Sequence, residues 1–150
     1  MRRARANSVA IGRLALAVAL AACAGRSAAS RGPVTLAGSE WLLIDVGGRP
    51  AVAGVRATLV FVDSASVAGN ATCNGFDGPL ELDGERVVRA GPFASTRRAC
   101  IDPVHAEQEM RYLQALREAE RVWLAGPQLL VTVRGLAQPL RFTRLRARRR

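Results

Sequence analysis

The segment Asp102–Glu118, DPVHAEQEMRYLQALRE, decides the fold class because its periodicity is helical while the rest of the chain reads as strands. Asp102 followed by Pro103 is typical of a helix N-cap with proline at the first helical position. Glu107 and Arg111 are spaced as an i,i+4 ion pair on a solvated face. Four apolar residues recur at helical spacing and predict the buried face: Ala106, Met110, Leu113 and Leu116. One amphipathic helix is therefore expected, ending near Glu118.

Short segments with strand-like alternation lie on both sides of this helix. They cover residues 41–46, 57–62, 66–72, 79–82 and 85–88 before it, and 122–124, 129–133 and 140–144 after it. The segment Cys73–Gly78 contains Asn and Gly and is expected to form tight turns. Trp41 and Trp123 are predicted to be core anchors and only secondarily ligand platforms. Roughly seven strands and one helix predict a mainly β (α+β) domain, an antiparallel β-barrel packed by the helix.

The first 22 residues have the layout of a secretory signal peptide, with arginines before an apolar run too short to span a bilayer. The run ends in Leu-Ala-Ala-Cys23, which resembles the lipobox of bacterial lipoproteins. We expect lipidation of Cys23, with residues 23–33 forming the lipidated start and a flexible tether. The alternative is an ordinary signal peptide with an incidental Cys23. Ala24 resembles the sorting signal for the outer membrane, so we expect the periplasmic face of that membrane in a diderm cell.

Charge is concentrated at the two ends of the chain. Ten of the 22 basic residues, all of them arginine, lie before Cys23 or in the last ten positions. The other 12 are balanced by 12 acidic residues, so no basic stripe suited to a nucleic-acid backbone is left, and no nucleic-acid partner is expected. The Arg-rich tail, residues 144–150, either docks on anionic lipid or stays solvated.

The chain has three cysteines. If lipidation uses Cys23, Cys73 and Cys100 remain and are expected to form a disulfide in an oxidising compartment. A zinc site is the competing interpretation. It is disfavoured because these cysteines and the single His105 supply too few ligands, and position 109 is Glu where a zinc-protease helix needs a second His. We expect no metal and no cofactor.

Five segments in order resemble the META domain family, which includes the heat-shock protein HslJ. They are residues 36–43, residues 57–61 with 67–74, residues 95–100, residues 107–116 and residues 124–131. Thr72 and Arg98 depart from the Gly and Met common in the family. The resemblance implies a small lipocalin-like β-barrel with a helix alongside, in an envelope protein without established catalytic activity. The predicted domain spans residues 34–143.

No catalytic motif is visible, because no Gly-x-Ser-x-Gly segment or phosphate-binding glycine loop occurs. We expect a non-enzymatic protein with a binding or stress-protective role towards a protein or cell-wall component. The alternative is a barrel that holds a small apolar ligand, although a short barrel tends to fill its own interior. Asn74, Arg97 and Arg98 form a candidate recognition surface. A disulfide-fixed turn with solvated arginines is the other interpretation, and the sequence leaves the oligomeric state open.

Overall fold

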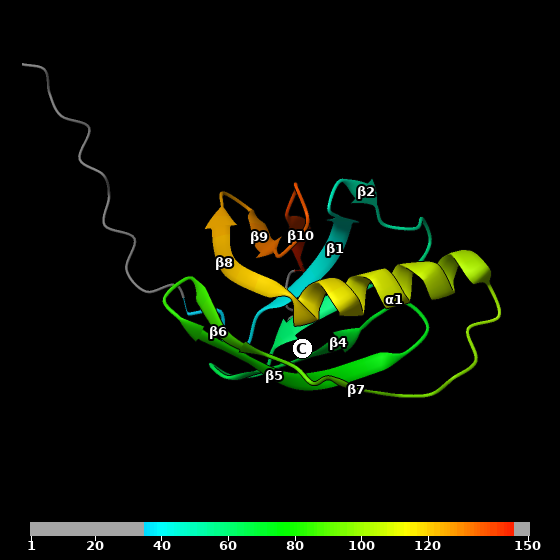
Figure 1. The fold of residues 1–150 in the computed structure, drawn as a ribbon, viewed down its shortest axis with the longest axis horizontal. Helices are drawn as coiled ribbons and strands as arrows, with labels where there is room; N and C mark the ends of the chain where they lie inside the picture. Colours follow the sequence, from blue (N-terminus) through cyan, green and yellow to red (C-terminus); the bar gives the residue numbers. More distant parts are fainter. Residues whose placement is uncertain (1–34, 146–150) are drawn as a thin grey trace, which may run out of the picture. The chain divides into compact units, whose positions relative to one another are not determined.

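A computed structural model describes residues 35–145 (Figure 1). The elements are β1 (Glu40–Val46), β2 (Arg49–Pro50), β3 (Thr58–Phe61), β4 (Ser66–Asn70), β5 (Gly75–Asp83), β6 (Arg86–Ala90), β7 (Ala94–Ser95), α1 (Pro103–Arg117), β8 (Ala119–Ala125), β9 (Gln128–Val133) and β10 (Leu140–Leu145). The predicted signal peptide, Cys23 and the tether lie outside the described residues, as does most of the Arg-rich tail. The first two tail residues, Arg144 and Leu145, belong to β10.

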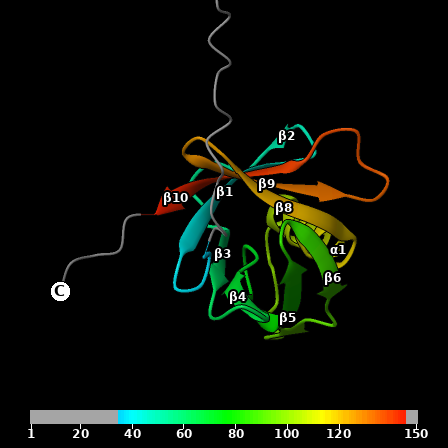
Figure 2. The ribbon, with the colours of Figure 1, turned by 90° about the vertical axis from the view of Figure 1, so that its left-hand side faces the viewer.

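Eight of the strands close into an antiparallel ring in the order β1-β3-β4-β5-β6-β8-β9-β10, and β10 returns to pair with β1 (Figure 2). The short β2 and β7 attach to β1 and β5 outside this ring. The predicted barrel with one helix is confirmed, with ten strands where roughly seven were predicted. The ring is weakest between β6 and β8, which share a single residue pair, Arg86 with Arg121.

Strand alternation fills the barrel with its own side chains. In β9, Leu129, Val131 and Val133 are buried and their neighbours are half-buried, as expected for a strand with one face on the core. Aromatic rings occupy the interior, with the ring centroid of Tyr112 5.8 Å from that of Phe76 and 6.0 Å from that of Phe142. The centre of the barrel is therefore a packed core.

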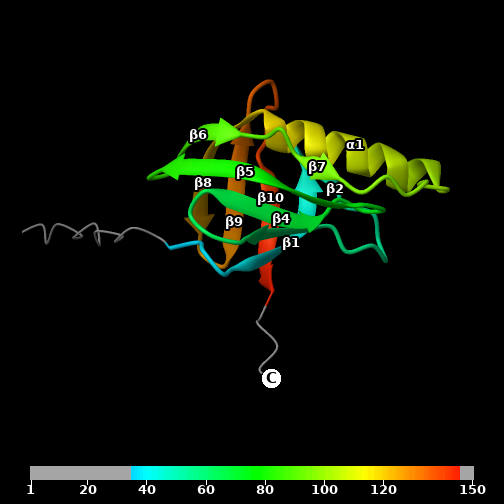
Figure 3. The same cartoon turned by 90° about the horizontal axis from the view of Figure 1, so that it is seen from below.

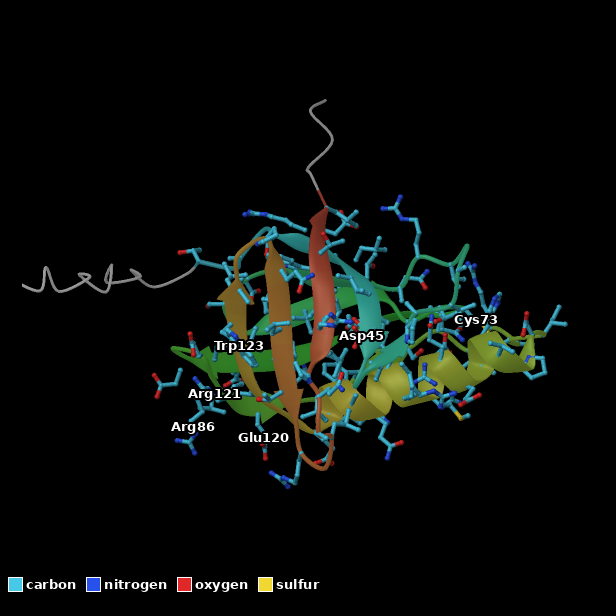
Figure 4. All side chains as sticks on the ribbon, turned by 90° about the horizontal axis from the view of Figure 1, so that it is seen from above. Asp45, Cys73, Arg86, Glu120, Arg121 and Trp123 are labelled. Carbon is cyan, nitrogen blue, oxygen red and sulfur yellow. A yellow bond between two sulfur atoms is a disulfide. The ribbon has the colours of Figure 1, made fainter. Side chains whose placement is uncertain are left out.

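An ion pair between a buried carboxylate and an exposed arginine joins the two strands that close the ring. The Asp45 carboxylate is almost fully buried and accepts hydrogen bonds from the Arg141 guanidinium and from the backbone N–H of Gly48, the latter at 3.0 Å (Figure 4). Asp45 and Arg141 are also register partners across β1 and β10. Because the carboxylate has lost its water, the guanidinium offsets a charge that would otherwise be costly to bury.

Helix α1 lies alongside the barrel and begins as predicted (Figure 3). The Asp102 side chain accepts a hydrogen bond from the Val104 N–H at 2.8 Å, and Pro103 is the first helical residue. The predicted Glu107–Arg111 pair is present at 3.5 Å. Within residues 35–145, α1 lacks the length and apolar character that a membrane-spanning helix requires.

The buried face of α1 includes Leu113 and Leu116, as predicted, but differs from the prediction at other positions. Met110 is 66% exposed, whereas the polar residues Gln108 and Tyr112 are fully buried. Hydrogen bonds offset the free-energy cost of burying these two polar side chains. Tyr112 donates to the Thr58 carbonyl at 3.1 Å, and Gln108 donates to the Thr72 hydroxyl at 2.9 Å. Apolar spacing alone could not reveal these long-range bonds.

Two predictions about strand residues were wrong. Trp123 is not a core anchor: Val122 points into the barrel, so Trp123 lies on the outer face, where the Arg121 guanidinium is 5.9 Å from its ring centroid (Figure 4). The segment Cys73–Gly78 is not a series of tight turns, because β5 begins at Gly75. Gly78 is needed there for close packing, since a Cβ would lie 2.7 Å from the Pro92 carbonyl oxygen.

Candidate functional site

The predicted disulfide is present and links two loops. Cys73, just before β5, is bonded to Cys100, just before α1, with a Cα–Cα distance of 5.6 Å. Figure 4 shows Cys73 at one end of the domain, beside the start of α1. The three residues of the candidate recognition surface are sequence neighbours of this bond, and the Arg98 N–H donates to Asn74 at 2.7 Å. Cysteine counting was sufficient to find the pair.

Asn74 is buried and its side-chain amide is fully occupied. Its Nδ2 donates to Glu109 Oε1 at 2.7 Å and to the Arg98 carbonyl at 3.2 Å. Its Oδ1 accepts from the Thr96 hydroxyl at 2.8 Å and from the Arg98 N–H at 2.7 Å. These four bonds use the full capacity of an amide. The prediction that the Asn74 side chain belongs to a recognition surface is therefore wrong, whereas Arg97 and Arg98 are exposed.

Glu109 is the residue that sequence reasoning missed at this end. Its Oε2 accepts from the N–H groups of Cys73 and Asn74, both at 2.8 Å, while Oε1 binds the Asn74 amide. A carboxylate bonded to three donors makes strong, charge-assisted contacts. Nothing local in the sequence links Glu109 to a loop 35 residues away.

Gln108, the neighbour of Glu109, bonds to one further loop and to the loop that Glu109 already holds. Its Oε1 accepts from the Val52 N–H, and its Nε2 donates to Thr72. Helix α1 thus holds the segments after β2, before β5 and before its own start. We name the combination of Asn74, Glu109 and Gln108 the loop clamp.

The chemistry of this end is structural. The loop-clamp side chains bind backbone and side-chain groups of the domain itself, and no group of three potential metal ligands occurs among the described residues. His105 lies 3.7 Å from an Asp102 oxygen at the start of α1. An open, shallow depression on the outer face of β4, β5 and β7 is lined partly by Gly69, Asp77 and Ser95.

Comparison with known proteins agrees with this architecture. The sequence profile of the META domain matches residues 34–147. The chain belongs to the META domain family. Two solved structures resemble this META domain, each with a TM-score of 0.57. One is an NMR structure at 25% identity, covering 72% of this chain and 90% of the other; the second, from Burkholderia xenovorans, is 23% identical and covers 75% and 85%. No curated protein matched the chain.

Replacement of Asn74 by alanine is expected to destabilise this META domain by about 2–3 kcal/mol, because buried donors and acceptors on Glu109, Thr96 and Arg98 lose their partner. Urea denaturation followed by circular dichroism measures the change. Asn70→Ala is the matched control: Asn70 is exposed and its side chain bonds only the nearby Thr72 N–H, so about 1 kcal/mol or less is expected. Equal losses in the two variants would contradict the loop clamp.

The stability of the META domain is expected to fall above pH 10. Burial raises the pKa of Tyr112 well above its usual value of 10.0. Below pH 10 the phenol is protonated in both states; above it the unfolded chain ionises first, so stability declines by up to about 1.4 kcal/mol per pH unit until the folded pKa is reached. Tyr112 is the single tyrosine, so the phenolate absorbance reports this group directly. The chain has no lysine, so no lysine side chain titrates in the same pH range.

Tyr112→Phe provides the control for this pH dependence. It gives up the bond to the Thr58 carbonyl, about 1 kcal/mol, but should remove the decline above pH 10. Phenolate absorbance that rises near pH 10 while the domain is still folded would contradict the assignment.

Proposed function

We propose that this chain is a non-enzymatic, exported lipoprotein of the cell envelope whose META domain binds a protein or cell-wall component on its outer surface. The observation that supports this proposal most strongly is the filled barrel, in which aromatic rings are buried: Phe61, Phe76, Tyr112 and Phe142. The polar groups of the loop clamp are likewise bonded within the domain. This leaves the outer face as the place for a partner. The same packing counts against the alternative of a small apolar ligand inside the barrel.

The proposed address rests on the lipobox-like segment that ends at Cys23, with attachment to the periplasmic face of the outer membrane in a diderm cell. The Cys73–Cys100 disulfide supports export, because structural disulfides persist in oxidising compartments. Intact mass of the membrane-extracted protein tests it. We expect a chain that starts at Cys23, carries added lipid mass and gains two alkylatable thiols only after reduction. An unprocessed chain with three free thiols would overturn the address.

The proposed binding role is tested separately from the address. The protein is incubated with purified cell-wall sacculi and sedimented, and in parallel is examined by native mass spectrometry. Retention on sacculi, together with an empty barrel in the spectrometer, supports a cell-wall partner. A small molecule that stays bound through native ionisation would replace the proposal with the ligand-binding alternative. A protective role predicts that a strain lacking the protein loses viability under envelope stress and regains it on complementation.

A further inference from the structure

The loop before α1 presents an apolar side chain to solvent. Ile101 is 95% exposed, the highest value among the exposed large hydrophobic residues of the described chain, and Val104, three residues later, is 56% exposed. We name residues 97–104 the disulfide tip. Single exposed apolar residues are common. An almost completely exposed isoleucine beside a disulfide and two arginines is a more specific combination.

The disulfide tip is held in place at several points. Cys100 is tied to Cys73, the N–H and carbonyl groups of Arg98 both bind Asn74, and Asp102 caps the helix. These contacts fix the backbone but leave the side chains of Arg97, Arg98 and Ile101 pointing away from the core. A preorganised surface loses little conformational freedom on binding, so it binds more tightly than a mobile loop with the same side chains.

Within the described part of the chain, the two arginines of the tip make no ion pair. Among the ion pairs of residues 35–145, none includes Arg97 or Arg98. Asp102, the acidic residue of the tip, is occupied by helix capping and by its approach to His105. The tip therefore offers two free guanidinium groups next to one protruding apolar side chain.

We propose that the disulfide tip docks on an anionic lipid bilayer, with Arg97 and Arg98 at lipid phosphates and Ile101 at the boundary of the acyl chains. Guanidinium groups bind phosphate oxygens well, and apolar residues flanked by basic ones are typical of interfacial membrane contact. A fluid bilayer needs no preformed pocket and can close around a protruding isoleucine.

This proposal is independent of the lipid on Cys23. The first described residues lie at the end of the domain away from the start of α1 (Figure 1). Each arginine near an anionic surface raises membrane affinity by about fivefold, and this gain falls as salt increases. The tip thus acts as a salt-sensitive contact of the folded domain, whatever holds the N-terminus.

The test uses a tryptophan as a depth probe in the full chain. All variants carry Trp123→Phe, which removes the half-buried indole and leaves the buried Trp41 as background. Ile101→Trp is compared with Val62→Trp, an exposed apolar position outside the tip. The protein is floated with vesicles of phosphatidylcholine, with or without phosphatidylglycerol, that contain brominated lipids as quenchers. Only vesicle-bound protein is measured. Attachment through the first residues alone would therefore not favour position 101 over position 62.

With phosphatidylglycerol, we expect the Ile101→Trp indole to shift to shorter wavelength and to be quenched severalfold more than the Val62→Trp indole. Vesicles without phosphatidylglycerol, or the added changes Arg97→Gln and Arg98→Gln, should remove the difference. Equal quenching at positions 101 and 62 would overturn the proposal, as would quenching at 101 that persists without anionic lipid or without both arginines. The two proposals can fail separately. If the chain proves to be unprocessed and unlipidated, the proposed address is overturned, but the tip proposal stands as long as the quenching pattern is the expected one.

Discussion

Gly69→Ala is expected to destabilise the domain by about 4 kcal/mol or more, because the added methyl group has no space in the barrel. A Cβ at this position would lie 2.1 Å from the Thr58 carbonyl oxygen and 2.9 Å from the Phe76 ring. The carbonyl cannot retreat cheaply, since it accepts the hydrogen bond from the buried Tyr112 hydroxyl. Guanidinium denaturation at pH 7 measures the loss.

Gly75→Ala is the matched control for this prediction. Gly75 is also a strand glycine, and in the β4–β5 ladder it pairs with Asn70, next to Gly69. A Cβ there would meet nothing closer than 3.7 Å, so the change in stability is expected to stay within about 0.5 kcal/mol. If Gly69→Ala proved as stable as Gly75→Ala, the close approach of β4 to the Thr58 carbonyl would have to be abandoned.

Removal of the Cys73–Cys100 disulfide has the second large effect. The bond closes a loop with a sequence separation of 27, and the chain-entropy estimate for such a loop is roughly 3–4 kcal/mol. The variant with both cysteines changed to alanine should therefore unfold at a much lower denaturant concentration. Because α1 and the loop clamp still hold the same loops, the variant should remain folded in buffer and show the same far-ultraviolet circular dichroism.

Reduction of the unaltered protein supplies the comparison for the double-alanine variant. If the stabilisation comes from cross-linking alone, the reduced protein and the variant should have the same denaturation midpoint. Cys23→Ser, which leaves the cross-link intact, should leave the midpoint unchanged in the oxidised protein. A double-alanine variant as stable as the oxidised protein would show that the loop clamp alone suffices to order this end of the domain.

Local sequence signals predicted the elements of this fold well. The start of α1 followed from Asp102 and Pro103, because capping chemistry involves residues only a few positions apart. Most strands were predicted from the alternation of apolar and polar residues, which is likewise a local signal. The disulfide followed from counting three cysteines and assigning one of them elsewhere.

The contacts that organise the candidate site could not be read in this way. Asn74 and Glu109 meet only after α1 has packed against the barrel, so neither looks structural in its own neighbourhood. Gln108 and Tyr112 appear as polar positions on a helix, yet they are buried in the same face as Leu113 and Leu116 because distant residues bind their polar atoms. Trp123 was assigned by residue type, whereas the alternation of β8 decides which way it points.

The closure of the ring by β1 and β10 makes folding depend on two strands that lie far apart in the sequence. Glu40 pairs with Leu145, and the buried carboxylate of Asp45 meets its guanidinium only on β10. Until β10 is in place, the β10-facing edge of β1 stays unpaired and open to other chains. A chain cut before β10 would therefore keep an open sheet edge and an unpaired carboxylate, and would be a substrate for chaperones rather than a smaller domain.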